Sequence, residues 1–272
     1  MPPKRVVFLH YHIFKNAGTT IDLVLEQELG TTFRLEAEAP DDSIGSDVLL
    51  EVLEQRPDIL FVSSHALRPP RPTFAGYHLV DIVFLRHPID RFRSIFDFSR
   101  ALFPDGNSTA EAAQRFGLAD FAAWMANETP WNFFDPQTTF MGNRGDFFFP
   151  PTEQAYYLAK QRTLDVRLLG TVELLAESFQ ACNRYLQGVR PNIALRPPND
   201  PANATTIRAK TLHERVELVR QTLGRVPFAH LEEALRRDLQ LWEVASAEVM
   251  RRYELCSPWL LPAPSTRQHQ KE

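Results

Sequence analysis

The chain has 272 residues, of which 44% are hydrophobic and 24% charged, and its formal net charge at pH 7 is −4. This composition is ordinary for a globular protein, and the negative charge argues against broad nucleic-acid binding, although it permits a local basic pocket. We expect one large domain over residues 1–256 and a disordered, proline-rich tail over residues 257–272.

Neither a membrane-spanning segment nor a disulfide framework is predicted. No apolar run reaches the roughly 18 residues of a transmembrane helix, and the apolar stretch after MPPKR is too short for a signal peptide. Cys182 and Cys256 are the only cysteines, which is too few for a disulfide framework or a zinc site. The sequence therefore favours a cytoplasmic protein, or a Golgi-lumen protein if an N-terminal anchor has been removed.

The first third of the chain alternates apolar, β-branched runs with segments of helical spacing. Strands are expected at residues 6–12, 31–38, 58–65 and 78–87, and helices at 19–29, 47–55 and 88–103. The stretch 104–152 is rich in Phe, Trp, Pro and Gly, and there we expect little regular structure beyond one helix at 109–126. Further on we expect a strand at 166–172 and helices at 152–163, 173–187, 211–223 and 228–253. This order predicts an α/β fold: a P-loop-like, mostly parallel sheet flanked by helices, with a helical C-terminal part.

The stretch HIFKNAGTT (residues 12–20) joins the first expected strand to the first expected helix. Such a turn presents unpaired backbone N–H groups and a partial positive charge to an anion. Gly18 permits close backbone approach, Lys15 adds a full charge, and Thr19 and Thr20 offer hydroxyls. A Walker A loop places its lysine directly after the second glycine, an order that this stretch lacks. The pattern indicates an anion-binding loop; an ordinary turn with a surface lysine is the alternative.

The stretch FLRHPIDRFRS, residues 84–94, also places candidate binding residues at the end of an expected strand. Arg86 stands at the end of the expected strand, and Ser94 follows in the next helix. An arginine that donates two hydrogen bonds and a serine hydroxyl together suit a phosphate group. We expect Arg91 and Arg93 either to assist or to lie on a solvated helix face.

Together the two stretches resemble the donor-binding motifs of sulfotransferases. HIFKNAGTT resembles the loop that binds the 5′-phosphosulfate of 3′-phosphoadenosine 5′-phosphosulfate, and VFLRHPIDRFRS resembles the strand and helix that bind its 3′-phosphate. The forms H-I-x-K-x-x-G-T-T and R-x-P-x-x-R-x-x-S are most similar to the carbohydrate type, in particular to heparan sulfate and uronyl 2-O-sulfotransferases. Weaker similarities are FVSSHALRP, VRLLGTVELLAESFQACNRYL and NATTIRAKT, so that about 250 residues are covered in the same order.

The resemblance implies a transferase that moves a sulfuryl group to an acceptor hydroxyl, on a glycan or glycoconjugate, without a metal. Lys15 would stabilise the leaving oxygen and His65 would be the base. The residues implied to bind the donor are Lys15, Asn16, Ala17, Gly18, Thr19, Thr20, Arg86, Ser94, Thr205 and Thr206. Phe14 departs from the proline usual in this loop, and Ser63 stands where the 2-O-sulfotransferases carry a first histidine.

Several alternatives remain open at this point. His12 or a carboxylate, Glu36 or Glu38, is also a candidate base, and His87, beside Arg86, is expected to support either the structure or the site residues. Three rival functions stand beside the sulfotransferase: a non-catalytic relative that binds nucleotide or glycan, a P-loop-type small-molecule kinase, and a purely structural α/β domain. A kinase requires the Walker A order and a strand-end aspartate for magnesium, which these stretches fit poorly.

Overall fold

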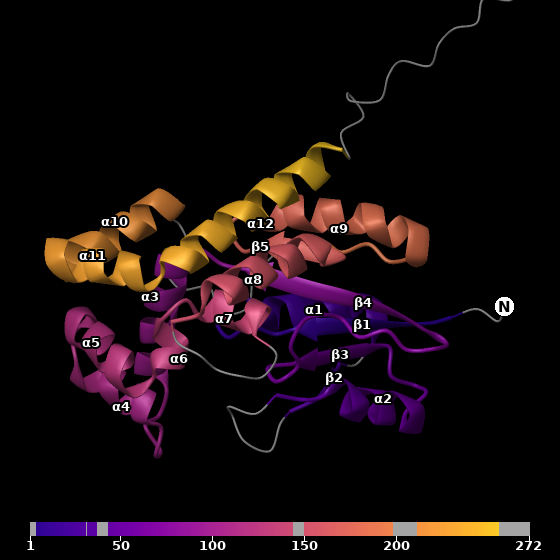
Figure 1. The fold of residues 1–272 in the computed structure, drawn as a ribbon, viewed down its shortest axis with the longest axis horizontal. Coiled ribbons are helices and arrows are strands. Elements are labelled where there is room, and N and C mark those ends of the chain that lie inside the picture. The colour runs from indigo at the N-terminus through magenta and orange to yellow at the C-terminus, as the bar shows by residue number, and fades with distance from the viewer. Residues whose placement is uncertain (1–3, 31, 37–42, 144–149, 198–210, 256–272) are drawn as a thin grey trace, which may run out of the picture.

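The computed structural model describes residues 4–30, 32–36, 43–143, 150–197 and 211–255 (Figure 1). Its centre is a five-stranded sheet in the order β2-β3-β1-β4-β5, in which every neighbouring pair is parallel. The strands are β1 Arg5–Tyr11, β2 Phe33–Arg34, β3 Phe61–Ser64, β4 Tyr77–Leu85 and β5 Leu168–Thr171. Helices flank this sheet, which confirms the predicted α/β class. The expected tail, Glu38, Thr205 and Thr206 lie outside the described residues.

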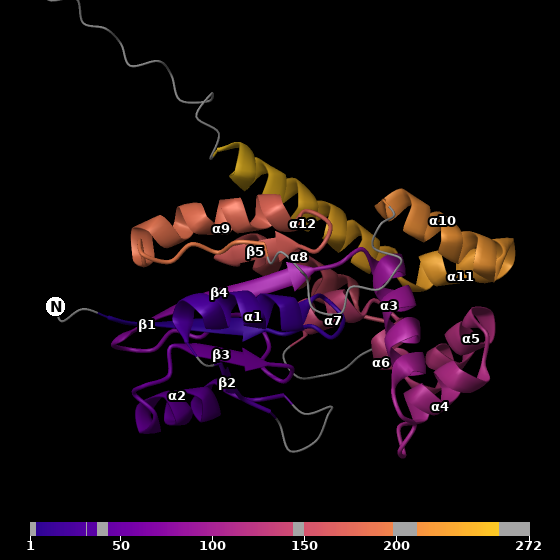
Figure 2. The same ribbon diagram turned by 180° about the vertical axis from the view of Figure 1, so that it is seen from behind.

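Alternate side chains of the central strands enter two different cores. On β1, Phe8 packs with one face of helix α1 (Gly18–Leu29) and with α9 (Leu175–Val189), the two helices in front in Figure 2. Val7 and Leu9 point to the opposite face of the sheet. The helices that cover this second face are α2 Ser46–Gln55, α7 Pro136–Gly142, α8 Glu153–Asp165 and α12 Arg236–Glu254. Both faces of the sheet are thus buried, as expected for parallel strands.

A third core lies beyond the carboxyl ends of the strands, on the left of Figure 1. It is formed by α3 Pro88–Ala101, α4 Ser108–Arg115, α5 Leu118–Glu128, α6 Pro130–Phe133, α10 Leu212–Leu223 and α11 Arg225–Ala234. Phe92, Phe121 and Phe133 pack against one another there, so these aromatic residues serve the core. The helices form a wall opposite the strand ends, where parallel sheets place their ligand sites.

The helical segments differ from the prediction in three places. The helix expected at 109–126 is two helices, α4 and α5, because the chain is extended at Phe116 and Gly117. The stretch 104–152 holds more regular structure than expected, since Pro130 and Pro136 each begin a helix. The helix expected at 228–253 is divided at Leu235 into α11 and α12.

The strand expected at 31–38 is only two residues long in the structure, Phe33–Arg34. In the part of the chain that the structure describes, no helix combines the length and apolarity needed to cross a membrane.

Candidate active site

The strand ends before Lys15 (β1), His65 (β3) and Arg86 (β4) lie on neighbouring strands and meet at one edge of the sheet. β1 lies between β3 and β4, with His10 beside Ser63 on one side and Ile82 on the other. The chain continues from β1 toward β3 and from β4 toward β5, in opposite directions across the sheet. Such a change of direction leaves a crevice at the carboxyl ends of the strands, which is where open α/β sheets bind their ligands.

The loop between β1 and α1 has an unusual backbone. Lys15 and Ala17 have φ angles of 63° and 59°, a left-handed conformation that side chains other than glycine rarely adopt. Helix α1 begins at Gly18, and no side chain of the described residues caps it, whereas Thr152 caps α8. The first-turn amides of a helix have no intrahelical acceptor. The loop and the helix start, with Gly18, Thr19 and Thr20, therefore have N–H groups that an anion could accept hydrogen bonds from.

Glycine is required at position 18 because the His12 side chain lies against it, and not because of its backbone conformation. A Cβ atom at this position would lie 1.8 Å from Nε2 of His12, which is far inside van der Waals contact. The His12 side chain thus occupies the space that any larger residue would need, and it holds the start of α1 against the end of β1. Thr19 is exposed and Thr20 is buried.

Asn16 anchors the loop to the protein interior. Its side-chain Nδ2 donates to the carbonyl oxygen of Phe84 and to Oε1 of Gln137, both at 2.8 Å, and its backbone N–H donates to Ile13. Because these donors are already engaged and the residue is 2% exposed, the expected direct contact between Asn16 and the donor nucleotide is not supported. Its role is to fix the shape of the loop.

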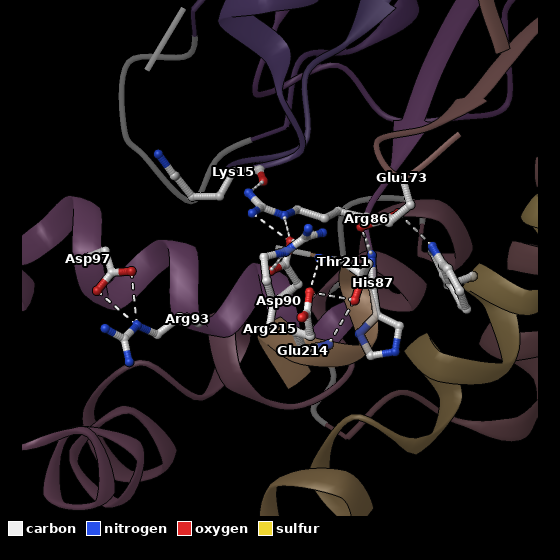
Figure 3. Close-up of polar contacts among 11 residues, drawn as sticks. Lys15, Arg86, His87, Asp90, Arg93, Asp97, Glu173, Thr211, Glu214 and Arg215 are labelled. Atoms are coloured by element: carbon white, nitrogen blue, oxygen red, sulfur yellow. Dashed lines mark hydrogen bonds and ion pairs between the residues drawn. The ribbon is translucent and has the colours of Figure 1, made fainter. Parts of the chain in front are cut away.

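The structure brings Lys15, Arg86 and Ser94 to the same place. Nζ of Lys15 lies 3.9 Å from the ring centre of Phe98, and the backbone carbonyl oxygen of Lys15 accepts a hydrogen bond from the Arg86 guanidinium. Ser94 is half-buried on α3, four residues before Phe98 and four after Asp90, so the three share one helix face. Lys15 and Arg86 thus reach this face from two different strand ends (Figure 3).

Arg86 is one of two arginines that hold the same buried carboxylate. Asp90 Oδ2 lies 2.7 Å from a guanidinium nitrogen of Arg86, and Asp90 Oδ1 lies 2.7 Å from Nε of Arg215 on α10 (Figure 3). Burial acts to raise the pKa of Asp90, but the two guanidiniums outweigh it and lower that pKa. Two positive charges thus flank one negative charge, and the group of three keeps a net charge of +1. The sequence did not indicate Arg215, which lies 125 residues after Asp90.

The other two arginines of the second motif have different surroundings. Arg91 is 3% exposed, and its Nε donates to the carbonyl oxygen of Phe14 at 2.9 Å, so the expected solvated position is wrong for this residue. Arg93 pairs with Asp97 one turn later on α3, as a charge on a helix face commonly does (Figure 3). Arg91 therefore supports the loop, and Arg93 belongs to the helix surface.

His65 follows β3 and is set up to accept a proton. Its Nδ1 donates to the carbonyl oxygen of His12 at 2.7 Å, which leaves the lone pair on Nε2. Burial and, to a lesser degree, the neighbouring His12 lower the pKa of His65, so the ring is neutral at pH 7. A cavity of about 630 Å³ opens beside it, with His12, Glu36 and His65 in its wall.

His10, His12 and Asp22 form a cluster that the sequence did not reveal. Their potential metal-ligand atoms lie within 4.8 Å of one another, but the two imidazole rings are stacked, 5.0 Å apart and 17° from parallel. The Nδ1 atoms of both rings face the Asp22 carboxylate, His10 at 2.6 Å and His12 at 3.4 Å. Asp22 instead accepts hydrogen bonds from His10 at 2.6 Å and Ser63 at 3.1 Å. The cluster is therefore a hydrogen-bonded support beneath the loop.

The comparisons with known proteins add little about function. The chain is 24% identical over 257 residues to an uncharacterized protein of Archaeoglobus fulgidus, a match that covers 88% of this chain and 95% of that protein. No protein-family model matches the chain.

Proposed function

We propose that the protein is a sulfotransferase that uses 3′-phosphoadenosine 5′-phosphosulfate and an acceptor hydroxyl. The observation that carries this proposal is the meeting of three groups at one sheet edge. These are the uncapped loop with Lys15, the Arg86–Asp90–Arg215 group, and His65 with its Nε2 lone pair. The resemblance of the two motifs supplies the identity of the donor.

The described residues suit a nucleotide that carries phosphate groups at the 5′ and 3′ positions of its ribose. The amides of Gly18 and Thr19, with the Lys15 ammonium, would hold the 5′-phosphosulfate, because a helix start and a cation both favour an anion. Arg86 and Ser94 would hold the 3′-phosphate, with Arg215 as a second arginine. The net charge of +1 on the Arg86–Asp90–Arg215 group suits a dianionic phosphate better than a neutral group.

Charge stabilisation and proton removal are divided between Lys15 and His65. The bound donor supplies the sulfuryl group, whose bond to the phosphate oxygen breaks as its bond to the acceptor oxygen forms. Lys15 has a long flexible side chain, so its ammonium can leave the Phe98 ring and neutralise the departing phosphate oxygen. His65 takes the acceptor proton on Nε2, a step that typically contributes about 10²- to 10⁴-fold.

The rival functions have less support. A P-loop-type kinase holds magnesium with a strand-end aspartate, whereas Asp90, five residues after the end of β4, is paired with two arginines. Glu36 remains an alternative base because it lines the same cavity as His65. A relative that binds nucleotide or glycan without turnover would retain the anion sites, and only a turnover measurement separates it from an enzyme.

The experiment is therefore a turnover assay that needs no prior choice of acceptor. Purified protein is mixed with 3′-phosphoadenosine 5′-phosphosulfate and a set of hydroxyl compounds, glycans among them, and release of 3′-phosphoadenosine 5′-phosphate is followed. Acceptor-dependent release that is lost in Lys15→Met and His65→Ala, and kept in Lys160→Met, supports the proposal. Binding of the nucleotide without release for any acceptor would favour the non-catalytic relative.

A further inference from the structure

The cavity beside His65 has walls from both halves of the site. One wall comes from the loop after β1 and from the segment after β3, with His12, Phe14 and His65. The rest of the described lining comes from the helical region between α3 and α7, including Trp131 and Phe140. Its volume of about 630 Å³ lies within the range of sites that enclose small molecules.

The reactive groups of the proposed function adjoin this space. His65 is part of the wall, and the ring of Phe98, another wall residue, is the one against which the Lys15 ammonium rests. A hydroxyl compound in the cavity can therefore meet the base and lie beside the lysine of the donor loop. The cavity is thus the acceptor side of the site, an assignment that rests on the proposed function.

The positively charged side chains on the described part of the cavity wall already interact with other groups of the protein. Among the described residues, the charged side chains that line it are Glu36, Arg68 and Arg91. Arg91 is buried and bonded to the carbonyl oxygen of Phe14, and the Arg68 guanidinium lies 4.2 Å from the ring centre of Phe140 and donates to backbone carbonyls. A polyanionic glycan requires a concentrated basic surface, and Glu36 would repel it.

Apolar and aromatic groups form the larger share of the rest of the described lining, beside the neutral polar side chains of Ser99, Asn107, Thr109, Asn132 and Thr139. The apolar and aromatic residues that carry the argument are Phe14, Ile95, Phe98, Leu102, Met125 and Trp131. They offer flat rings and hydrocarbon to a ligand, and such surfaces favour an apolar body with one oriented polar group.

We infer that the acceptor is a compact, uncharged, ring-bearing alcohol or phenol, whose apolar body packs against the aromatic lining while its hydroxyl meets His65. Of the glycans that the motif resemblance implies as acceptors, an acidic one does not suit this wall. Trp131 is the main determinant of acceptor choice in this account, because it offers the largest ring among the described lining residues.

Binding of simple probes tests this inference separately from turnover. We would titrate the protein, with 3′-phosphoadenosine 5′-phosphate present, with 2-naphthol, with a neutral methyl galactoside and with a uronate-containing tetrasaccharide. The expected result is a preference for 2-naphthol, weakened about tenfold or more by Trp131→Ala and largely restored by Trp131→Phe. Phe103→Ala, at a ring that is 91% exposed, is the control and should change nothing.

The outcomes separate the inference from the proposed function. Preference for the tetrasaccharide or the galactoside would overturn the inference and leave the sulfotransferase proposal intact. Unaltered 2-naphthol binding in a folded Trp131→Ala protein, checked by its thermal unfolding, would also overturn it. Failure of 3′-phosphoadenosine 5′-phosphate to bind at all would instead count against the proposed function, because the donor site would then be wrong.

Discussion

Gln137 holds both backbone groups of Arg86. Its side-chain Oε1 accepts from the Arg86 N–H, and its Nε2 donates to the Arg86 carbonyl oxygen, each at 2.9 Å. The same Oε1 accepts from Asn16 in the lysine loop. One fully buried side chain on α7 therefore fixes the end of β4 relative to the loop after β1, and these are the two segments that would hold the two ends of the nucleotide.

Replacing Gln137 with leucine should weaken nucleotide binding and protein stability together. The change leaves Asn16 and the backbone groups of Arg86 without their buried partner, at about 1–3 kcal/mol for each buried group left unsatisfied. We expect unfolding in urea at lower concentration and a reduced preference for 3′-phosphoadenosine 5′-phosphate over AMP, because the spacing of the two phosphate sites relaxes. Gln221→Leu, on the exposed face of α10, should alter neither property. An unchanged preference in folded Gln137→Leu would contradict the account.

Gly18→Ala should destabilise the loop by about 1–3 kcal/mol, as overpacking of a filled site does. The physical reason is the 1.8 Å approach of the new Cβ to Nε2 of His12. Chemical denaturation measures the change, and the double variant Gly18→Ala/His12→Ala should recover part of the loss. Gly188→Ala is the matched control, because nothing lies within 4 Å of a Cβ there, and it should stabilise α9 slightly. Equal effects at the two glycines would refute the explanation.

Arg215→Ala should weaken binding of 3′-phosphoadenosine 5′-phosphate about 10- to 100-fold, the loss expected for a hydrogen bond to a charged group. Binding of AMP should change much less, because AMP lacks the 3′-phosphate. Arg220→Ala removes an exposed arginine from the same helix and serves as the control. If both nucleotides lost affinity equally, Arg215 would be acting on the fold and not on the 3′-phosphate.

Catalytic rate should depend on pH through His65. Burial lowers the pKa of this residue below its ordinary 6.5, and under the proposed function the neutral ring is the active form. The rate should therefore be flat around pH 7 and fall only as the pH drops below about 6.5, the unperturbed value for histidine. His65→Ala should abolish most of the activity and also the fall in rate at low pH, which is the acidic limb of the pH profile. His230→Ala, at an exposed histidine, should keep the activity and the acidic limb. A limb that survives in His65→Ala would point to Glu36.

Stability should decrease in acid because of His87. Burial lowers its pKa to about 4, and its Nδ1 has no hydrogen-bond partner among the described residues. Between pH 6.5 and 4 the unfolded chain binds a proton that the folded protein does not, so unfolding becomes easier as the pH falls. The contribution between pH 7 and pH 5 is on the order of 1–2 kcal/mol.

His87→Phe should flatten that dependence in denaturation curves measured at pH 7 and pH 5. His230→Phe is its control at an exposed position. A pH dependence that is equally steep in His87→Phe and in the unchanged protein would exclude His87 as the cause.

The sequence was most informative where a candidate site residue closely follows the end of a strand. Lys15, His65 and Arg86 each stand within four residues of a strand end, so parallel pairing alone predicts that they meet. The central strands were recognisable from their apolar runs, because burial on both sheet faces favours apolar residues. Helix boundaries were less predictable, as Pro130 and Pro136 begin helices in a stretch that looked irregular.

The remaining parts of the site depend on contacts between distant segments. Gln137 lies 51 residues from Arg86, and Arg215 lies 125 residues from Asp90. Nothing local distinguishes these side chains from other glutamines and arginines of surface helices. Their roles arise from the packing of α7 and α10 against the strand ends, which only the folded chain defines.

The central claim is tested most directly by calorimetric titration with 3′-phosphoadenosine 5′-phosphate, without metal, beside AMP and ATP. The account predicts selective binding of the 3′-phosphorylated nucleotide, with that selectivity lost in Arg86→Ala and kept in Arg220→Ala. Binding of ATP in preference, strengthened by magnesium, or no binding of the 3′-phosphorylated nucleotide, would contradict the sulfotransferase proposal and favour the kinase.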